Sequence, residues 1–485
     1  LEVTRPGYRT LFPAASSLMF PIRPVVERVG FFDPVRKGAD TEYARRIEAA
    51  FGRRVVDVGS GALTVLRGLD DSLSASEFSF AWRHPVRWAY KQSYEVVHRS
   101  IRAGATPAFR EPETPPSAFG IARWYKPADP GYRARERVDV VLAGDWRRYG
   151  GPQISMLEEI QALLSGGLSV GVLHLEAMRF YTGKDQPVCA PLRELLSEGR
   201  VRLIHLDDEV DIGVLLLRYP PILQFPPATQ ARVKARCLLI VANQAPAERS
   251  GVDQRYIPAD VHENAANLFG VEPRWIPQSP AIRAVLEPLL PSDALGDWDN
   301  PAIIDVEAWV QERRRAPNHE PVIGRFSRDD VIKFPRTGKD LLEAYDFGPN
   351  TRVRMMGARS QVKRLLQPPD GPALEVPDTW EILPHKAMDV REFLATLDVV
   401  VYMDHPEAHE AFGRSLLESA ASGALVVASP KHKVTFGDAL LYAEPHEVVP
   451  MVRSYLADPT AMNAQVARTL QRVRERWGPE AFLGN

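Results

Sequence analysis

The stretch from Asp398 to Ala428 is the most informative part of the chain about its architecture, and it has the sequence DVVVYMDHPEAHEAFGRSLLESAASGALVVA. Its first six residues contain a Val-Val-Val-Tyr core that is short, β-branched and apolar, which predicts a buried parallel strand. Leu416, Leu417 and Ala420 recur at helical spacing and predict a helix from near Gly413, while Gly423 stands where a left-handed C-terminal cap belongs. The run from Ala424 to Ala428 predicts the next strand. The stretch is therefore a strand–loop–helix–strand unit, typical of an α/β protein with a doubly wound sheet.

The loop of this unit predicts an anion site. Backbone N–H groups of Phe412, Gly413 and Arg414 would face the crevice above the strand ends, where a helix N-terminus favours negative charge. Glycine also lets a phosphate come close. Glu410 in the loop and Glu418 in the helix add two carboxylates, which accept hydrogen bonds from hydroxyl groups. We therefore expect a ligand that carries both phosphate and hydroxyl groups.

Residues 410–427 form the pattern Glu-Ala-Phe-Gly-x-Ser-x-x-Glu-x-x-Ala-x-Gly-x-x-Val-Val, which resembles the motif of retaining GT-B glycosyltransferases, the glycogen-synthase-like superfamily. The resemblance implies two Rossmann-like domains facing a cleft. It also implies that Glu418 binds the nucleotide ribose, that Glu410 binds hydroxyls of the donor sugar, and that the segment between them holds sugar and phosphate. The donor-binding residues expected in that segment are Ala411, Phe412, Gly413, Arg414 and Ser415.

A second element lies upstream, where Pro321-Val-Ile-Gly-Arg325-Phe-Ser-Arg328 predicts a strand that runs into a polar loop. The same superfamily carries an arginine after this strand and a lysine soon after, both on the donor's diphosphate, and the resemblance assigns these roles to Arg325 and Lys333. Fixed cations are needed where no metal stabilises the departing diphosphate. The spacing departs from the commoner form, so Arg328 and Lys339 stay as rival phosphate ligands.

Residues 131–300 predict the first Rossmann-like domain, on the acceptor side. Strands are expected at 138–143, 168–175, 201–206 and 238–242, with a helix after the glycine-containing loop at 144–152. In the family this loop faces donor and acceptor, so Gly150 and Gly151 would permit close backbone approach; a tight turn alone is the alternative. His174 lies on a predicted strand and is interpreted as a core histidine.

Residues 301–460 predict the second domain, on the nucleotide-sugar side, with strands near 321–325, 352–356, 380–383, 398–403 and 424–428. The linker between the halves is expected at 293–318, including a helix at 305–315. Residues 461–485 are expected to form a C-terminal helix that crosses back onto the first half.

Residues 1–130 belong to neither half. Gly30-Phe-Phe-Asp33 followed by Asp40 resembles the closing section of a GT-A glycosyltransferase domain, which implies that Asp40 is an acceptor base. The nucleotide-binding strands of such a domain would precede this text, so we expect the chain to be part of a longer, bifunctional protein with a further GT-A portion. An accessory helical segment packed on the GT-B core is the alternative.

Composition excludes several classes. The net charge of −2 and the lack of a basic run argue against a nucleic-acid partner, and two cysteines, Cys189 and Cys237, give no disulfide framework or cysteine metal site. No apolar stretch approaches the ~20 residues of a membrane-spanning helix. We expect a bacterial cytoplasmic protein, with a peripheral position at the inner membrane face as a further option.

The sequence thus predicts a retaining, metal-independent glycosyltransferase that needs no cofactor and moves a sugar from a nucleoside diphosphate sugar to a carbohydrate or lipid-linked acceptor, as in polysaccharide synthesis. A non-catalytic nucleotide- or sugar-binding subunit of a larger assembly is the alternative. A glycosidase also uses paired carboxylates, but it needs no phosphate site. The base, the sugar, the acceptor and the oligomeric state stay open.

Overall fold

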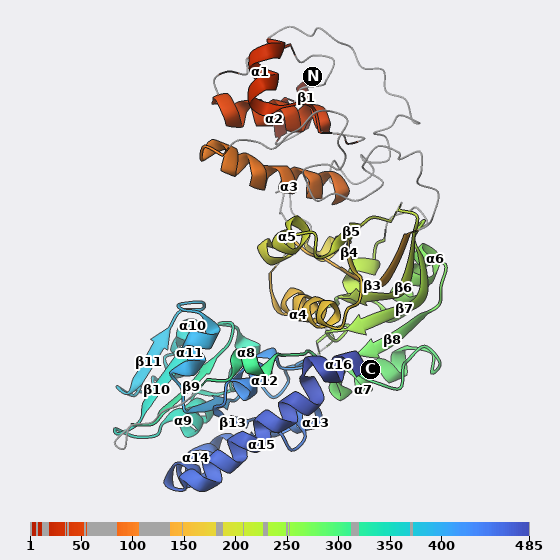
Figure 1. Cartoon of the computed structure of the whole chain (residues 1–485). Helices are drawn as coiled ribbons and strands as arrows, with labels where there is room; N and C mark the ends of the chain where they lie inside the picture. The colour runs from red at the N-terminus through yellow and green to blue at the C-terminus, as the bar shows by residue number, and fades with distance from the viewer. Residues whose placement is uncertain are drawn as a thin grey trace.

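The computed structural model describes residues 2–5, 8–11, 19–33, 35, 38–52, 55, 85–105, 136–147, 149–180, 188–206, 208–226, 231–248, 251, 253–311, 320–368 and 372–484, and the statements below concern these residues. They form two α/β halves and a separate N-terminal group of elements (Figure 1).

The second half, which holds the motif, is built on a six-stranded parallel sheet. Its strands lie in the order β11-β10-β9-β12-β13-β14, so the chain starts in the middle and winds outward in both directions. The strands are β9 (Val322–Phe326), β10 (Arg352–Met356), β11 (Trp380–Leu383), β12 (Val399–Tyr402), β13 (Leu425–Ala428) and β14 (Leu441–Tyr442). Its helices are α9 (Gly338–Tyr345), α10 (Arg359–Leu366), α11 (Val390–Ala395), α12 (Arg414–Ala421), α13 (Lys433–Phe436) and α14 (Pro445–Ala457). Apolar cores cover both faces, which explains the continuous apolar runs in its strands.

The first half repeats this plan with the strand order β5-β4-β3-β6-β7-β8, all parallel. The strands are β3 (Glu136–Gly144), β4 (Val170–His174), β5 (Arg202–Ile204), β6 (Val210–Arg218), β7 (Lys234–Ala242) and β8 (Pro273–Pro277). The helices are α4 (Gly151–Ser165), α5 (Ala190–Ser197), α6 (Pro258–Phe269) and α7 (Pro280–Leu286). Two Rossmann-like sheets with flanking helices confirm the predicted GT-B fold class.

Two strands of the first half were not expected from the sequence. β6 contains Gly213, whose β-carbon, if present, would lie 2.5 Å from the backbone oxygen of Asp139 on β3. This glycine therefore serves the close approach of two central strands, although a glycine inside an apolar run weakens the strand prediction. β8 is an edge strand that begins at Pro273 and ends at Pro277, and these prolines likewise weaken the strand signal in the sequence.

Residues 312–315 of the helix expected at 305–315 lie outside the described residues. In the described part, helix α8 covers only Val306–Trp309, and the chain is extended at Val310. The N–H of Gln311 donates to the carbonyl oxygen of Ser422, 3.2 Å away at the end of α12. A tertiary hydrogen bond thus replaces the helical one, and it fixes the linker to the motif helix.

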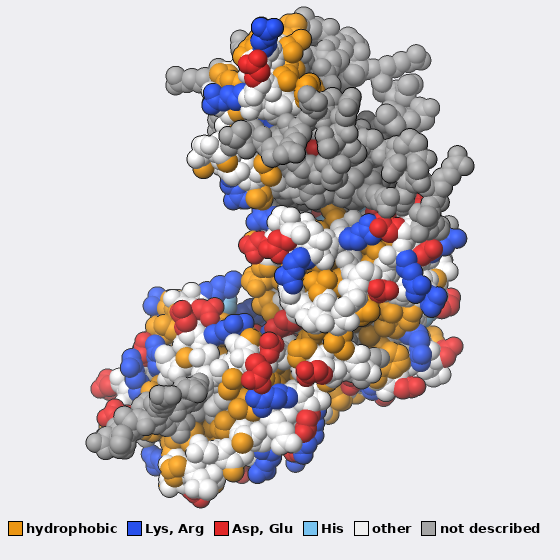
Figure 2. All heavy atoms as spheres, in the orientation of Figure 1, with side chains coloured by type: hydrophobic (Ala, Val, Ile, Leu, Met, Phe, Trp, Pro, Cys, Tyr) orange, Lys and Arg blue, Asp and Glu red, His pale blue; other side chains and the backbone are white. Residues whose placement is uncertain are grey.

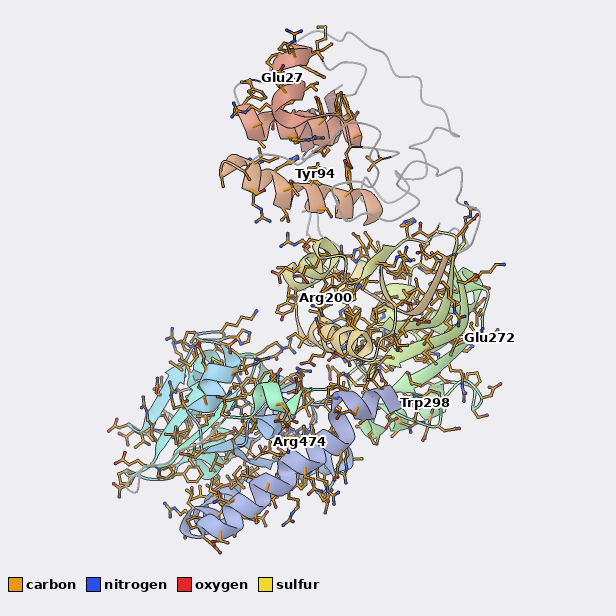
Figure 3. The ribbon with its side chains drawn as sticks, viewed as in Figure 1. Glu27, Tyr94, Arg200, Glu272, Trp298 and Arg474 are labelled. Carbon is orange, nitrogen blue, oxygen red and sulfur yellow. The ribbon has the colours of Figure 1, made fainter. Side chains whose placement is uncertain are left out.

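The C-terminus returns to the first half. Helix α15 (Pro459–Trp477) runs along the second half and is followed by α16 (Pro479–Gly484), which lies on α4 (Figure 1). Phe482 packs against the core under α4, and a β-carbon at Gly166 would lie 3.1 Å from Leu483. Figure 3 shows the same path, from Arg474 on α15 towards the part of the first half that carries Trp298.

The N-terminal elements are a two-stranded antiparallel pair, β1 (Glu2–Arg5) and β2 (Tyr8–Leu11), with helices α1 (Ile22–Val29), α2 (Ala39–Phe51) and α3 (Pro85–Arg102). Glu42 on α2 is fully buried and binds Arg46 on the same helix. It also binds His98 on α3, and this contact joins the two helices. Asp40 lies in the first turn of α2, and its Oδ1 accepts from the N–H of Thr41 at 2.7 Å. The acceptor-base role of Asp40 stays a prediction. None of the described helices is long and apolar enough to cross a bilayer.

Candidate functional site

Gly413 sets the geometry of the motif loop. It precedes the first residue of α12 with φ 95° and ψ 58°, a left-handed conformation that favours glycine. A β-carbon there would lie 3.3 Å from both Leu416 and Phe436. Its neighbour Phe412 is buried, with its ring centroid 5.3 Å from that of Phe436 and 6.0 Å from that of Trp477. The loop is therefore anchored by an aromatic side chain immediately before the turn that starts the helix.

Lys333 and Glu410 meet at this loop. Lys333 ends a short 3-10 turn (Val331–Lys333), and its ammonium forms an ion pair with Glu410 Oε2, although the two residues are 77 positions apart. Their side chains are 15% and 18% exposed. Burial alone would lower the pKa of Lys333, but the neighbouring Tyr402 and Glu410 outweigh it and hold that pKa above its ordinary value. The pair brings a fixed cation beside an acceptor carboxylate.

Arg325 lies in the interior of the second half. Its side chain is fully buried, and its guanidinium donates to the carbonyl oxygens of Met403, at 3.0 Å, and Lys333. It also lies over the ring of Phe334, 3.9 Å from the centroid. The side chain of Arg325 is fully buried in this structure, and its expected contact with the donor's diphosphate stays a prediction. Its hydrogen bonds hold the turn that carries Lys333.

The rival cations lie at the surface. The side chain of Arg328 is 67% exposed and its nearest carboxylate is that of Asp330 at 4.0 Å. Lys339 is 80% exposed and pairs along α9 with Glu343 at 3.5 Å. Neither is an ion-pair partner of Glu410, and Lys333 is therefore the best placed of the three lysine and arginine candidates.

A second cation shapes the chain leading to Glu410. Lys431 follows β13, and its ammonium lies 2.9 Å from Asp404 Oδ2 while donating to the carbonyl oxygens of His405, at 2.5 Å, and Ala408, at 3.3 Å. Burial tends to raise the pKa of Asp404, but His432 and Lys431 hold it below its usual range. This anchor was missed in the sequence, although both Asp404 and Lys431 stand just beyond strand ends, where such sheets bind ligands.

Glu418 and Arg414 extend the site to the first half. Arg414 Nε donates to Glu418 Oε1 at 2.8 Å, and its terminal nitrogens bind the carboxylate of Glu158 on α4. Burial raises the pKa of Glu418, and Arg414 opposes this shift. Ala411 also packs against the core of the first half. Ser415 is half-buried in the first turn of α12. The motif therefore lies where the two halves meet, and in Figure 2 the surface is notched between them.

Gly150 and Gly151 stand at the start of α4. Gly150 has an extended backbone with φ −155°, which any residue can adopt. Its N–H donates to Gln153 Oε1 at 3.2 Å. A β-carbon at Gly151 would have no atom within 4 Å, and one at Gly150 would meet only Gln153 at 3.8 Å. Packing within the described residues therefore does not demand glycine at either position. Their expected contact with a ligand stays a prediction.

Histidines near the site have structural partners. His174 is buried at the end of β4, where its Nδ1 accepts from the N–H of Trp146 at 3.1 Å, and burial lowers its pKa to about 4. His405 Nδ1 accepts from the N–H of Glu407 at 3.3 Å, and His409 lies half-buried in the motif loop. Within the described ranges, no three His, Cys, Asp or Glu side chains are grouped to hold a metal ion.

Comparison with known proteins finds the same fold. No protein-family model and no curated protein matches the sequence. Among solved structures, Alr3699/HepE from Anabaena, in complex with UDP and glucose, is similar over 71% of this chain and 97% of its own, with 14% identity and a TM-score of 0.50. A glycosyltransferase from Rickettsia africae matches over 72% of this chain and 96% of its own, with 12% identity and a TM-score of 0.48. TarM matches over 73% and 98%, with 10% identity and a TM-score of 0.48. The likeness to HepE shows that residues of both halves together adopt the GT-B fold.

Proposed function

We propose that this chain is a retaining, metal-independent glycosyltransferase that moves a sugar from a nucleoside diphosphate sugar to an acceptor hydroxyl. The observation that carries the proposal is the Lys333–Glu410 pair beside Gly413. It brings a fixed cation and an acceptor carboxylate together beside the start of α12, the helix whose Arg414 contacts Glu158 on α4. A fold shared with glycosyltransferases supports the same interpretation.

In this proposal each group addresses a different part of the donor. Lys333 would stabilise the charge that builds on the departing diphosphate, and the amides of residues 411–415 would add hydrogen bonds to it. Glu410 would accept hydrogen bonds from the sugar hydroxyls, and Glu418 from those of the ribose. The leaving phosphate oxygen would take the acceptor's proton on the same face of the sugar, which gives retention. Arg325 and Lys431 act indirectly, by holding the two loops that carry Lys333 and Glu410.

The donor screen starts from uridine nucleotides, because HepE was crystallised with UDP and glucose. The base and sugar of this chain are open, and the screen therefore includes GDP-, ADP-, CDP- and dTDP-sugars. The acceptor is proposed to be a carbohydrate or a lipid-linked sugar of a bacterial polysaccharide or glycoconjugate.

The test measures release of the nucleoside diphosphate from each donor, with and without EDTA, for the wild type and Lys333→Met. We expect one donor to turn over equally in EDTA, and Lys333→Met to lower kcat/KM by about 10²-fold or more, because a preorganised charge is lost. Lys339→Met, which removes an exposed lysine from the adjoining helix, is the matched control and should behave as the wild type. NMR of the product's anomeric proton then tests retention.

Three results would count against the proposal. Equal loss in both lysine variants would mean that Lys333 has no special role. Release of free sugar without any nucleotide dependence would favour a glycosidase. Nucleotide binding without turnover on any donor and acceptor would favour a non-catalytic subunit.

A further inference from the structure

An ion-pair bridge connects the two halves at the motif. Glu158, on α4 of the first half, binds two nitrogens of Arg414 on α12 of the second half. Arg414 Nη1 also donates to the carbonyl oxygen of Ile303, 3.0 Å away in the linker between the halves. Its Nε donates to Glu418 Oε1 at 2.8 Å. One guanidinium is therefore held by the first half, the linker and the second half at once.

Glu158 is itself on a rigid support. The next residue, Glu159, is fully buried and forms an ion pair with Arg218 on β6. Asn300, at the start of the linker, donates to Glu159 Oε1 at 3.2 Å. Consecutive helical residues point about 100° apart, so α4 uses Glu159 to fix itself to its own sheet and Glu158 to reach the other half. A bidentate arginine–carboxylate pair adds geometric precision to that link.

The bridge leaves Glu418 able to bind a ligand. Arg414 contacts one carboxylate oxygen of Glu418 through a single N–H, whereas a carboxylate offers about four acceptor positions. The side chains of Glu158, Arg414 and Glu418 are 25%, 16% and 10% exposed, so water screens the three charges only partly. Two carboxylates around one guanidinium would repel each other without it, and Arg414 therefore determines where Glu418 points.

We infer that Glu158 is a positioning residue for Glu418: acting through Arg414, it makes ribose recognition in the second half depend on the docked first half. The inference rests on the proposed function, because it takes Glu418 as the ribose ligand. When Glu158 is lost, the terminal nitrogens of Arg414 keep only the Ile303 carbonyl among the contacts described above, and Glu418 loses its fixed orientation. The class of ligand affected is a nucleotide with free ribose hydroxyls.

The test compares ribonucleotides with their 2′-deoxy forms by titration calorimetry. UDP, GDP, ADP and CDP and their deoxy counterparts are titrated into the wild type, Glu158→Gln, Glu418→Gln and the double variant. We expect Glu158→Gln to raise the Kd of the bound ribonucleotide about tenfold and that of its deoxy form much less, since one charged hydrogen bond to the sugar is weakened. In the Glu418→Gln background, Glu158→Gln should have no further effect, because both changes remove the same interaction.

Two further variants sharpen the result. Glu158→Asp keeps the charge but shortens the reach, and it should give an intermediate loss. Glu307→Gln removes the carboxylate from an exposed pair with Arg474 and is the matched control, with wild-type affinities expected. Urea unfolding of each variant shows whether it is folded.

The outcomes separate this inference from the proposed function. Equal weakening of ribo and deoxy forms, or additive effects in the double variant, would overturn the role of Glu158 while leaving a nucleotide site in place. No binding of any nucleotide by the wild type would instead overturn the proposed function, and this inference with it.

Discussion

At the scale of single residues, Arg325 is a buried side chain that holds two segments of the site together. Its guanidinium joins the end of β12, through Met403, to the turn that ends at Lys333. Aromatic rings of Phe334 and Tyr402 lie within 3.9 Å and 5.3 Å of its central carbon. A planar fork can reach two carbonyl oxygens and stack on a ring together, which an ammonium group cannot do.

Arg325→Lys should therefore be strongly destabilising. We expect a loss of about 2 to 4 kcal/mol in the free energy of unfolding, since buried carbonyl groups lose their donors. Urea denaturation measures it. Arg328→Lys, at an exposed neighbour, should stay within about 0.5 kcal/mol of the wild type. Similar stabilities for the two variants would show that Arg325 does not hold the loop.

His174 predicts a pH dependence of stability. Its pKa is lowered to about 4 by burial, so between that pH and its ordinary value near 6.5 only the unfolded chain binds the proton. Stability contributed by the neutral ring is complete above pH 6.5 and is lost as the pH falls towards 4. The loss is about 3 kcal/mol.

The measurement is urea unfolding at several pH values for the wild type and His174→Gln. Other groups titrate in the same range, and Glu158 and Glu418, whose pKa values are raised by burial, act in the opposite direction. The difference between the two curves isolates the histidine. The stability advantage of the wild type over His174→Gln should become smaller as the pH falls from 6.5 to 4. Parallel curves would contradict the lowered pKa of His174.

At the scale of elements, glycine stands before α12 and at the start of α4 for different physical reasons. Gly413 has a positive φ and close neighbours, whereas Gly151 begins α4 with no atom near the position of a β-carbon. Gly413→Ala should cost about 1 to 2 kcal/mol of stability, and Gly151→Ala should be neutral or stabilising by up to about 1 kcal/mol.

Ligand affinity gives the second readout of this pair. If a ligand approaches the backbone at Gly151, then Gly151→Ala weakens nucleotide-sugar binding although the protein is as stable as the wild type. Thermal unfolding with and without the donor measures both effects. Unchanged affinity in Gly151→Ala would mean that this loop serves only as a turn.

The motif unit was predictable because local patterns agree with one another there. Gly413, Gly423 and the two apolar runs place β12, α12 and β13 within a residue or two of their observed bounds. β6 and β8 were not predictable, because their signals are broken by Gly213 and by flanking prolines that only the packed sheet explains. In the described part of the segment 305–315 the helix ends at Trp309, because the N–H of Gln311 donates to the Ser422 carbonyl oxygen instead of continuing the turn.

Contacts between residues far apart in the sequence limit how much of the site can be predicted. The sequence predicted Lys333 and Glu410 as site residues, but only the structure shows that they pair across 77 positions. Arg325 is fully buried, and no spacing rule could show that burial from the sequence. Glu158 is 256 positions from Arg414 and looks like any helical glutamate in the sequence.

At the scale of the whole molecule, the two halves are joined by more than a linker. Helix α16 lies on α4, the N–H of Ile304 donates to the Trp477 carbonyl oxygen at 2.8 Å, and Glu158 binds Arg414. The Glu158–Arg414 pair includes a residue of the motif, so movement of one half against the other would act on the motif through this pair. Domain closure over a donor is therefore expected to change nucleotide affinity.

A thermal-shift screen with UDP, GDP, CDP, ADP and dTDP, each with magnesium and with EDTA, shows whether the chain binds a nucleotide at this loop. We expect stabilisation by one nucleotide, equal in both conditions, reduced in Lys333→Met and Glu418→Gln and kept in Lys339→Met. No stabilisation by any of the five nucleotides, or a shift that survives in both site variants, would contradict the claim that the Lys333–Glu410 loop region is a nucleotide-sugar site.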